Sequence, residues 1–265
     1  LTVTDNGFFA GVDAGLLVPN NTIAIGESAA RAFAYNASLS RRLVAIGRWA
    51  GTSTTAGESN TFVGFASGYS ATSANSNSAF GDYALFGNTT GDFNTAVGRD
   101  ALKNQTIGAS NTAVGAEALQ SSGAANSSSN TAVGAYSMKA TTTGNWNTAV
   151  GESALLVLTT GIYNTAMGQL AGSGITTGMY NTAIGKGAMT GATGTGNFNT
   201  SVGSNAGLNS AGGSGNTFVG FGAGNTRKGS HNTAIGHNAF FPYAESSGNI
   251  AIGGMNAAGT RAPAY

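Results

Sequence analysis

The sequence predicts an all-β fold: a parallel β-solenoid, or β-roll, of about 14 coils with a 17-residue period. Three observations lead to this class. The phrase Asn-Thr-Ala-Val-Gly and its variants recur along most of the 265-residue chain. The copies return at a nearly constant spacing. That spacing is too short for a strand, two turns and a helix of ordinary length, whereas short strands joined by turns fit within it.

The repeat is defined by the glycine that closes each copy of the phrase. These glycines are Gly26, Gly47, Gly64, Gly81, Gly98, Gly115, Gly134, Gly151, Gly168, Gly185, Gly203, Gly220, Gly236 and Gly253. Nine of the thirteen spacings are 17 residues, and the others are 21, 19, 18 and 16. Stacked coils require this regularity, because each repeat must meet its neighbour in register and extra residues fit only at turns.

Each repeat divides into two halves, and we expect two strands of four to five residues joined by two turns. The first half is the core phrase, which begins with an asparagine that can form a stacked amide ladder. The second half begins with alanine three residues after the glycine and ends in a Ser/Thr/Gly turn, such as Thr159–Gly161. We expect residues 1–20 to be an N-terminal cap or linker, 21–257 the repeat domain, and 258–265 a C-terminal tail or linker.

Strand alternation assigns the side chains of the core phrase to two faces. The large apolar position, represented by Val97, Val114, Val133 and Val150, is predicted to line the inside of the coil. The small position before it is then predicted to face sister chains in a parallel homotrimer. Its members include Ala96, Ala113, Ala132, Ala149, Ala166 and Ala183. The threonine two residues before the valine shares the valine's face, and this argues against a flat, exposed threonine array of the kind that binds ice.

Composition limits the function. Charged residues make up 8% of the chain and the formal net charge is +1, so the chain has no basic stripe for nucleic acid. The absence of cysteine excludes disulfides and thiolate metal sites, and no apolar run reaches the length of a membrane span. We expect no cofactor. Low charge on a slender rod favours burial of one face by self-association.

The repeated phrase resembles the repeats of a known family. The unit Asn-Thr-Ala-Val/Ile-Gly-x-x-Ala is similar to the head repeats of YadA-like trimeric adhesins, which form a left-handed parallel β-roll trimer. The longer phrase at Thr142–Gly151 and Thr159–Gly168 is still more similar to phage tail-fibre repeats. The resemblance covers about residues 21–257. It implies an extracellular protein, on a virion or a bacterial surface, that contacts adjoining fibre domains or proteins.

Chemistry-bearing residues are sparse. Asp100 and Glu117 occupy equivalent positions one coil apart, at a spacing that a glycosidase pair can use, although exposed carboxylates on a turn are the more usual explanation. His231 and His237 are interpreted as surface turn residues without a metal. We therefore expect no enzyme, and a polysaccharide-cleaving solenoid is the remote alternative.

Aromatic residues occupy the position before the repeat asparagine in four consecutive coils: Trp146, Tyr163, Tyr180 and Phe198. They predict either a structural ladder or a platform for cell-surface carbohydrate. Candidate end caps are Phe8, Phe9, Phe240, Phe241 and Tyr243. The expected function is a structural or adhesive segment of a phage tail fibre or spike. The alternative is the head of a bacterial trimeric adhesin that binds matrix or carbohydrate.

Overall fold

The computed structural model describes residues 2–4, 7–13, 21–32, 42–121, 123, 125–191, 194–208, 212–225, 229–239 and 247–254. These residues form strands and turns and contain no helix, which confirms the predicted all-β class. The chain divides into two compact units, residues 1–135 and 136–265, and each is described by itself. The boundary falls inside the predicted repeat domain. The predicted tail, 258–265, lies outside the described residues.

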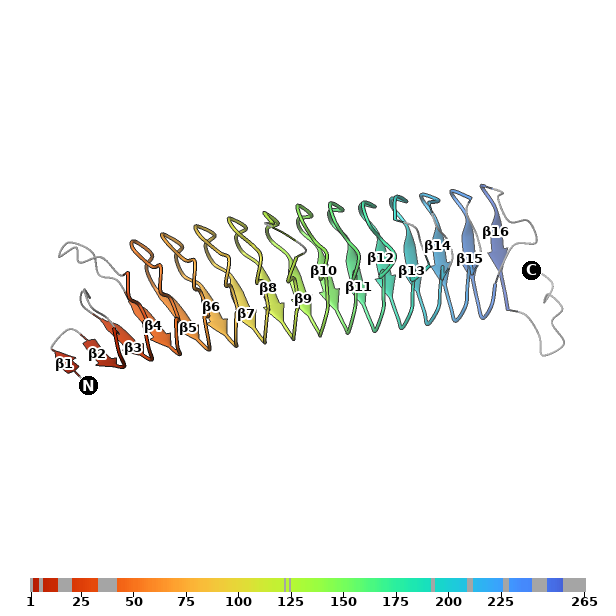
Figure 1. The fold of residues 1–265 in the computed structure, drawn as a ribbon. Helices are drawn as coiled ribbons and strands as arrows, with labels where there is room; N and C mark the ends of the chain where they lie inside the picture. The colour runs from red at the N-terminus through yellow and green to blue at the C-terminus, as the bar shows by residue number, and fades with distance from the viewer. Residues whose placement is uncertain are drawn as a thin grey trace. The chain divides into compact units, whose positions relative to one another are not determined.

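Unit 1 is a stack of parallel strands with one antiparallel strand at its N-terminal end (Figure 1). Strand β1 pairs antiparallel with β2, and each later neighbour pair is parallel and in register. The strands are β1 (Thr2–Thr4), β2 (Gly7–Ala10), β3 (Thr22–Ile25), β4 (Leu43–Ile46), β5 (Asn60–Val63), β6 (Ser78–Phe80), β7 (Thr95–Val97), β8 (Thr112–Val114) and β9 (Thr131–Val133).

Unit 2 continues the same repeat with parallel, in-register neighbours throughout. Its strands are β10 (Thr148–Val150), β11 (Thr165–Met167), β12 (Thr182–Ile184), β13 (Thr200–Val202), β14 (Thr217–Val219), β15 (Thr233–Ile235) and β16 (Ile250–Ile252). Strands β3 to β16 coincide with the fourteen copies of the core phrase. The predicted parallel β-solenoid with a 17-residue period is therefore confirmed.

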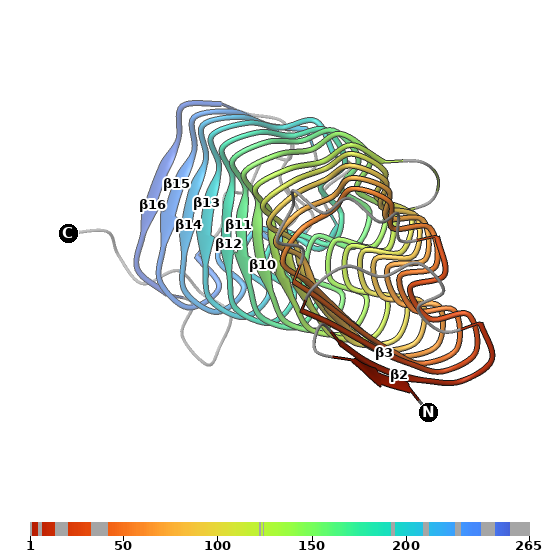
Figure 2. The ribbon, with the colours of Figure 1, turned by 90° about the vertical axis from the view of Figure 1, so that its left-hand side faces the viewer.

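The expectation of two strands per coil is wrong. Among the described residues, each coil has one strand of three or four residues, and turns close the opposite side (Figure 2). The turns use left-handed backbone at non-glycine residues, as at Phe93 (φ 58°), Asp100 (φ 60°) and Leu102 (φ 53°). These conformations are unfavourable for ordinary residues. They persist because hydrogen bonds between coils hold them, for example Leu102 N–H donating to the Ala118 carbonyl at 3.0 Å.

The predicted assignment of the two strand faces is inverted. The alanines of the core phrase are buried within the single chain, with no exposed surface at Ala96, Ala113 or Ala149. The valines stack in register as expected, but on the outer face, where Val97 is 38% exposed. The inside of a one-strand coil is narrow, so it usually holds the small residue and accepts a large one only where glycine stands opposite.

The inside of each coil is filled by complementary volumes. In six coils the strand contributes alanine and the opposite turn contributes a buried leucine or methionine, such as Leu85 or Leu102. Phe62 instead occupies the alanine position, and glycines stand opposite. A Cβ at Gly68 would lie 2.5 Å from the Phe62 ring, and one at Gly51 would lie 3.1 Å from it. Phe218 and Gly224 repeat this exchange in unit 2, where the corresponding distance is 2.2 Å.

The repeat asparagines form the predicted amide ladder. The Asn164 Oδ1 accepts hydrogen bonds from the backbone N–H and the Nδ2 of Asn181, at 3.0 Å each. The Asn164 Nδ2 donates to the Gly178 carbonyl at 2.8 Å, which ties this strand to a turn of the next coil. Sequence reasoning missed a second ladder, in which threonine hydroxyls at one turn position donate to a threonine carbonyl of the next coil, as from Thr72 to Thr89 at 3.0 Å and from Thr142 to Thr159 at 3.2 Å.

At the N-terminal end of unit 1, one of the candidate cap residues is buried. Phe9 pairs with Ala24 in register and is 8% exposed, so its ring covers the first alanine of the interior row. The antiparallel β1 then covers the edge of β2. The other candidate caps, Phe240, Phe241 and Tyr243, lie outside the described residues, as does the side chain of Phe8.

Candidate interaction surface

The outer face is the set of strand side chains that point away from the coil interior. It consists of a threonine row and, two residues later, a row of large apolar residues. In unit 1 the pairs are Thr61 and Val63, Ser78 and Phe80, Thr95 and Val97, Thr112 and Val114, and Thr131 and Val133. In unit 2 they are Thr148 and Val150, Thr165 and Met167, Thr182 and Ile184, Thr200 and Val202, Thr217 and Val219, and Thr233 and Ile235.

The outer face carries no charged residue in either unit. Its side chains are half-buried to exposed, and their rows are in register from strand to strand. Contiguous exposed apolar patches of this kind are uncommon on monomeric soluble proteins and usually mark an interaction site. The charged residues of the same coils stand on the turns instead, as Arg99 and Lys103 do.

The prediction that a row of alanines faces sister chains in a trimer is wrong. Ala96, Ala113, Ala132, Ala149, Ala166 and Ala183 have no exposed area in the isolated chain, so they cannot contact a sister chain. The threonine row was correctly expected to share the face of the valine row. That face is the outer one, so the parity argument against an exposed threonine array no longer holds.

The predicted aromatic ladder is present in unit 2. Successive ring centroids lie 5.0 Å apart from Trp146 to Tyr163, 5.0 Å from Tyr163 to Tyr180, and 5.1 Å from Tyr180 to Phe198. The ring planes are nearly parallel, with interplanar angles of 5°, 12° and 5°. Each ring face inside the stack is covered by its neighbour, so solvent reaches the ring edges. This geometry is typical of a stabilising stack.

A second aromatic group, which sequence reasoning missed, lies on the turns of unit 1. We call it the aromatic cluster: Trp49, Phe65, Tyr69, Tyr83 and Phe86. All five residues are half-buried. They occupy two adjacent turn positions of the repeat and another position three residues later. When the repeats are aligned, the aromatic residues therefore fall in different columns, and no single column shows the group. Aligning the repeats and marking rings at adjacent turn positions would have found the group.

The carboxylate pair is held by cations. Arg99 contacts Glu117 at 3.2 Å and Asp100 at 3.7 Å, and the Lys103 Nζ lies 2.8 Å from the Asp100 carboxylate. Asp100 is buried, contrary to the expected exposed turn position. An ion-pair cluster of this kind is common among structural carboxylates on protein surfaces.

Both histidines are exposed turn residues, as predicted. His237 stacks on Phe221 with centroids 5.3 Å apart. Within the described residues, no three His, Cys, Asp or Glu side chains are grouped to hold a metal ion. The same residues contain no helix that is long and apolar enough to span a membrane.

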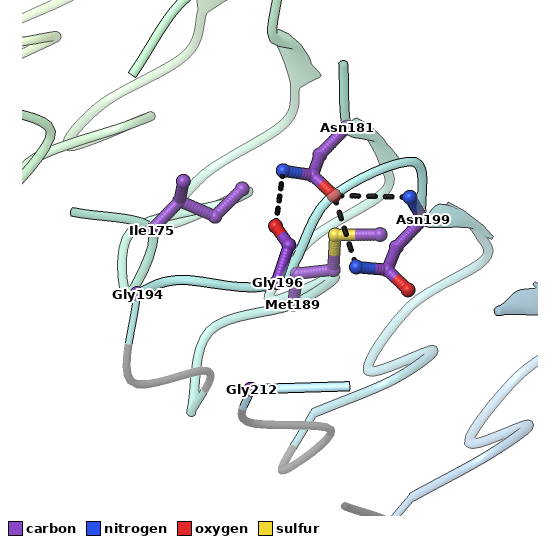
Figure 3. A pocket seen from close by; sticks show the side chains of 7 residues that line it. All are labelled: Ile175, Asn181, Met189, Gly194, Gly196, Asn199 and Gly212. Carbon is purple, nitrogen blue, oxygen red and sulfur yellow. Dashed lines mark hydrogen bonds between the residues drawn. The ribbon is translucent and has the colours of Figure 1, made fainter. Parts of the chain in front are cut away.

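The coil interior of unit 2 has a small gap where one repeat carries an extra residue. The gap is about 10 Å³ and is bordered by Ile175, Asn181, Met189, Gly194, Gly196, Asn199 and Gly212. Figure 3 shows the amides of Asn181 and Asn199 joined across its rim. A space of about 10–15 Å³ holds at most one water. It is therefore a packing adjustment and not a ligand site.

Comparison of the chain with protein-family models, with curated protein sequences and with solved structures gives no match.

Proposed function

We propose that the chain is a structural and adhesive fibre segment that assembles as a parallel homotrimer through its outer face. A phage tail fibre or spike that projects a receptor-binding region is the setting that best suits it. The observation that carries the proposal is the outer face itself, which presents two in-register rows without a charge. The proposed extracellular location, and contacts with adjoining fibre domains, follow from the resemblance of the repeats.

A parallel arrangement suits this face because the repeat is regular. An axis parallel to the stack of coils keeps each coil level with its equivalents in the other chains. The valine rows then meet valine rows along the length of a unit. Removing large apolar side chains from water contributes about 25 cal/mol per Å². Threonine methyl groups add to this contact, and their hydroxyls can pair at its margin. The choice of three copies follows the adhesin and fibre resemblance.

The test compares three lysine substitutions in one coil. Val97→Lys places a charge on the outer face, Ile107→Lys places one on a turn where the side chain is already 55% exposed, and Ala96→Lys places one in the coil interior. An unpaired buried charge is strongly unfavourable. Val97→Lys should therefore yield a folded monomer, Ile107→Lys should remain assembled, and Ala96→Lys should unfold.

Sedimentation equilibrium measures the mass, and far-UV circular dichroism measures the fold. The unsubstituted chain should sediment at three times its chain mass of 26.1 kDa. If the parent chain is a folded monomer at micromolar concentration, the fibre proposal fails. If it is a trimer that Val97→Lys leaves intact, the outer face is not the interface.

Two other functions use the same surfaces. A bacterial adhesin head would share the trimer and differ in binding matrix or carbohydrate directly. An ice-binding face is favoured by the outward threonine row. The bulky Phe80 and Met167 interrupt its flatness, which makes it the weaker candidate. A monomer that produces thermal hysteresis, and loses it on Thr112→Lys substitution, would select the ice-binding function over the fibre.

A further inference from the structure

We propose that the Phe80 ring of one chain packs over Ser78 of a sister chain at the same level, and that this contact fixes the register of the assembly. The inference rests on the self-association proposed above, and it deepens that proposal by naming the residues that select the correct alignment. Both residues belong to the outer face of β6, on either side of the buried Ala79.

Most of the outer face cannot specify how two copies align. Strands β7, β8 and β9 present the same threonine and the same valine, in rows that continue in register from coil to coil. Neighbouring coils lie about 4.8 Å apart. A copy displaced by one coil therefore meets the same side chains again. A repeating surface of this kind needs a specific feature that disfavours displaced registers.

Strand β6 departs from the repeat at both of its outward positions. Among the described strands β3 to β16, it alone has serine at the threonine position and an aromatic residue at the valine position. Serine lacks the methyl group of threonine, whereas phenylalanine is larger than valine. A loss and a gain of volume thus coincide in one coil. The same relation joins Phe62 and Gly68 in the coil interior, where the two residues are in contact.

The chain by itself leaves Phe80 and Ser78 partly uncovered. The Phe80 ring is 43% exposed, although Val63 and Val97 flank it in register. Ser78 is half-buried, as Thr95 is at the same position of the next coil, so the ring leaves part of Ser78 open to solvent. About an axis parallel to the stack, the valine rows meet and each is flanked by the threonine row of a neighbour. A ring larger than valine extends to that row, where Ser78 provides the space.

A displaced copy loses this fit. A shift of one coil places Phe80 against Thr61 or Thr95 of the sister chain and leaves Ser78 beside a valine. The ring is then overpacked, and the serine leaves a gap; both are unfavourable. The level arrangement avoids these penalties. Because the outer face carries no charged residue, a second copy also covers it without burying an unpaired charge.

Exchanging side-chain sizes between chains tests the contact. Ser78→Phe places a second ring at this level, so the variant should assemble about tenfold or more weakly than the parent chain. Phe80→Ser restores the space, but in a different chain. Two chains are produced together in the same cells, and their assemblies are sorted by native mass spectrometry. We expect Ser78→Phe chains to assemble with Phe80→Ser chains about tenfold more than with parent chains.

The matched control moves the ring by one coil. Thr95→Phe places it on β7, so Phe80→Ser chains should accept this variant no better than parent chains do. Circular dichroism confirms that each variant is folded, and Ser78→Leu replaces Ser78→Phe if the larger ring prevents folding.

Three results would overturn the inference. The first is Ser78→Phe assembly as tight as that of the parent. The second is no preference of Ser78→Phe chains for Phe80→Ser chains over parent chains. The third is a preference of Phe80→Ser chains for Thr95→Phe, which would show that the chains are displaced by one coil. Sedimentation of the parent chain separates the two proposals. A monomeric parent ends both, whereas a trimeric parent without the expected preference overturns the register contact alone.

Discussion

Exchanging the volumes inside one coil tests how the repeat packs. Phe62→Ala removes a buried ring, and Gly68→Leu adds a side chain against that ring. Phe→Ala substitutions in cores are destabilising by about 3–5 kcal/mol. Gly68→Leu alone should be destabilising by about 1–3 kcal/mol or more from overpacking, since a Cβ there would lie 2.5 Å from the ring. The double variant recreates the alanine and leucine pair of the neighbouring coils, such as Ala79 and Leu85.

The backbone permits this exchange. Gly68 has a φ of 58°, and Leu85 at the equivalent position has a φ of 53°, so leucine already adopts this conformation in the fold. The left-handed region still disfavours leucine relative to glycine by about 1–2 kcal/mol. The double variant should therefore lie within about 2 kcal/mol of the parent, with a coupling free energy near the upper end of the usual range, about 3 kcal/mol.

Urea unfolding followed by far-UV circular dichroism provides the free energies, at one protein concentration because assembly makes stability concentration-dependent. The matched control combines Phe62→Ala with Gly224→Leu in unit 2. Gly224 packs against Phe218, so these two losses should simply add. A Phe62→Ala/Gly68→Leu chain no more stable than Phe62→Ala would refute the argument that complementary volumes fill the coil.

Two further predictions concern the turns. Gly151→Ala should be destabilising by more than about 3 kcal/mol, because φ values near +130° are essentially restricted to glycine and the new Cβ would lie 2.5 Å from the Gly168 carbonyl oxygen. The control is Gly123→Ala, where nothing lies within 4 Å of the new Cβ. Thermal unfolding should show that this control keeps the stability of the parent chain. Tyr180→Ala loses two stacking contacts worth about 0.5–1.5 kcal/mol each, whereas Phe93→Ala, flanked by Ser76 and Ser110 at the equivalent position, should lose less. Equal losses at these two positions would show that stacking does not stabilise the ladder.

The fold could be predicted because the constant spacing of the repeat determines the register of neighbouring strands. Each coil needs a glycine at the position of Gly151, because the backbone there has a strongly positive φ. Each asparagine at the position of Asn164 needs an asparagine in the next coil to complete its hydrogen bonds. Such requirements leave a strict period in the sequence. The second half of the coil could not be predicted as turns. Its left-handed residues, such as Phe93 and Leu102, are types that ordinarily avoid this conformation.

The aromatic sites show a similar limit. The ladder from Trp146 to Phe198 follows one column, so its stacking was foreseeable from the period. Whether it exposes faces or edges depends on the side-chain angle, which the spacing does not determine. The cluster around Phe65 joins different columns of successive coils. Its members approach one another because they occupy nearby turn positions of stacked coils, and strand-like alternation cannot anticipate this.

The two strand faces are the reverse of the predicted ones for a single physical reason, and the same reason supports assembly. Alternation shows that Ala96 and Val97 point to opposite sides, and ordinary experience assigns the larger apolar residue to the core. In a coil with a single strand, an alanine and the leucine opposite it fill the interior, just as Phe62 and the glycine opposite it do in another coil, so volume and not hydrophobicity alone decides which residue is inside. The valine row is left outside, and the interior buries little apolar surface per residue. The missing burial is available on the outer face, and a sister chain is the partner whose rows have the same period. The thin interior and the apolar exterior are thus consequences of one geometry, and the mass of the Val97→Lys variant tests both.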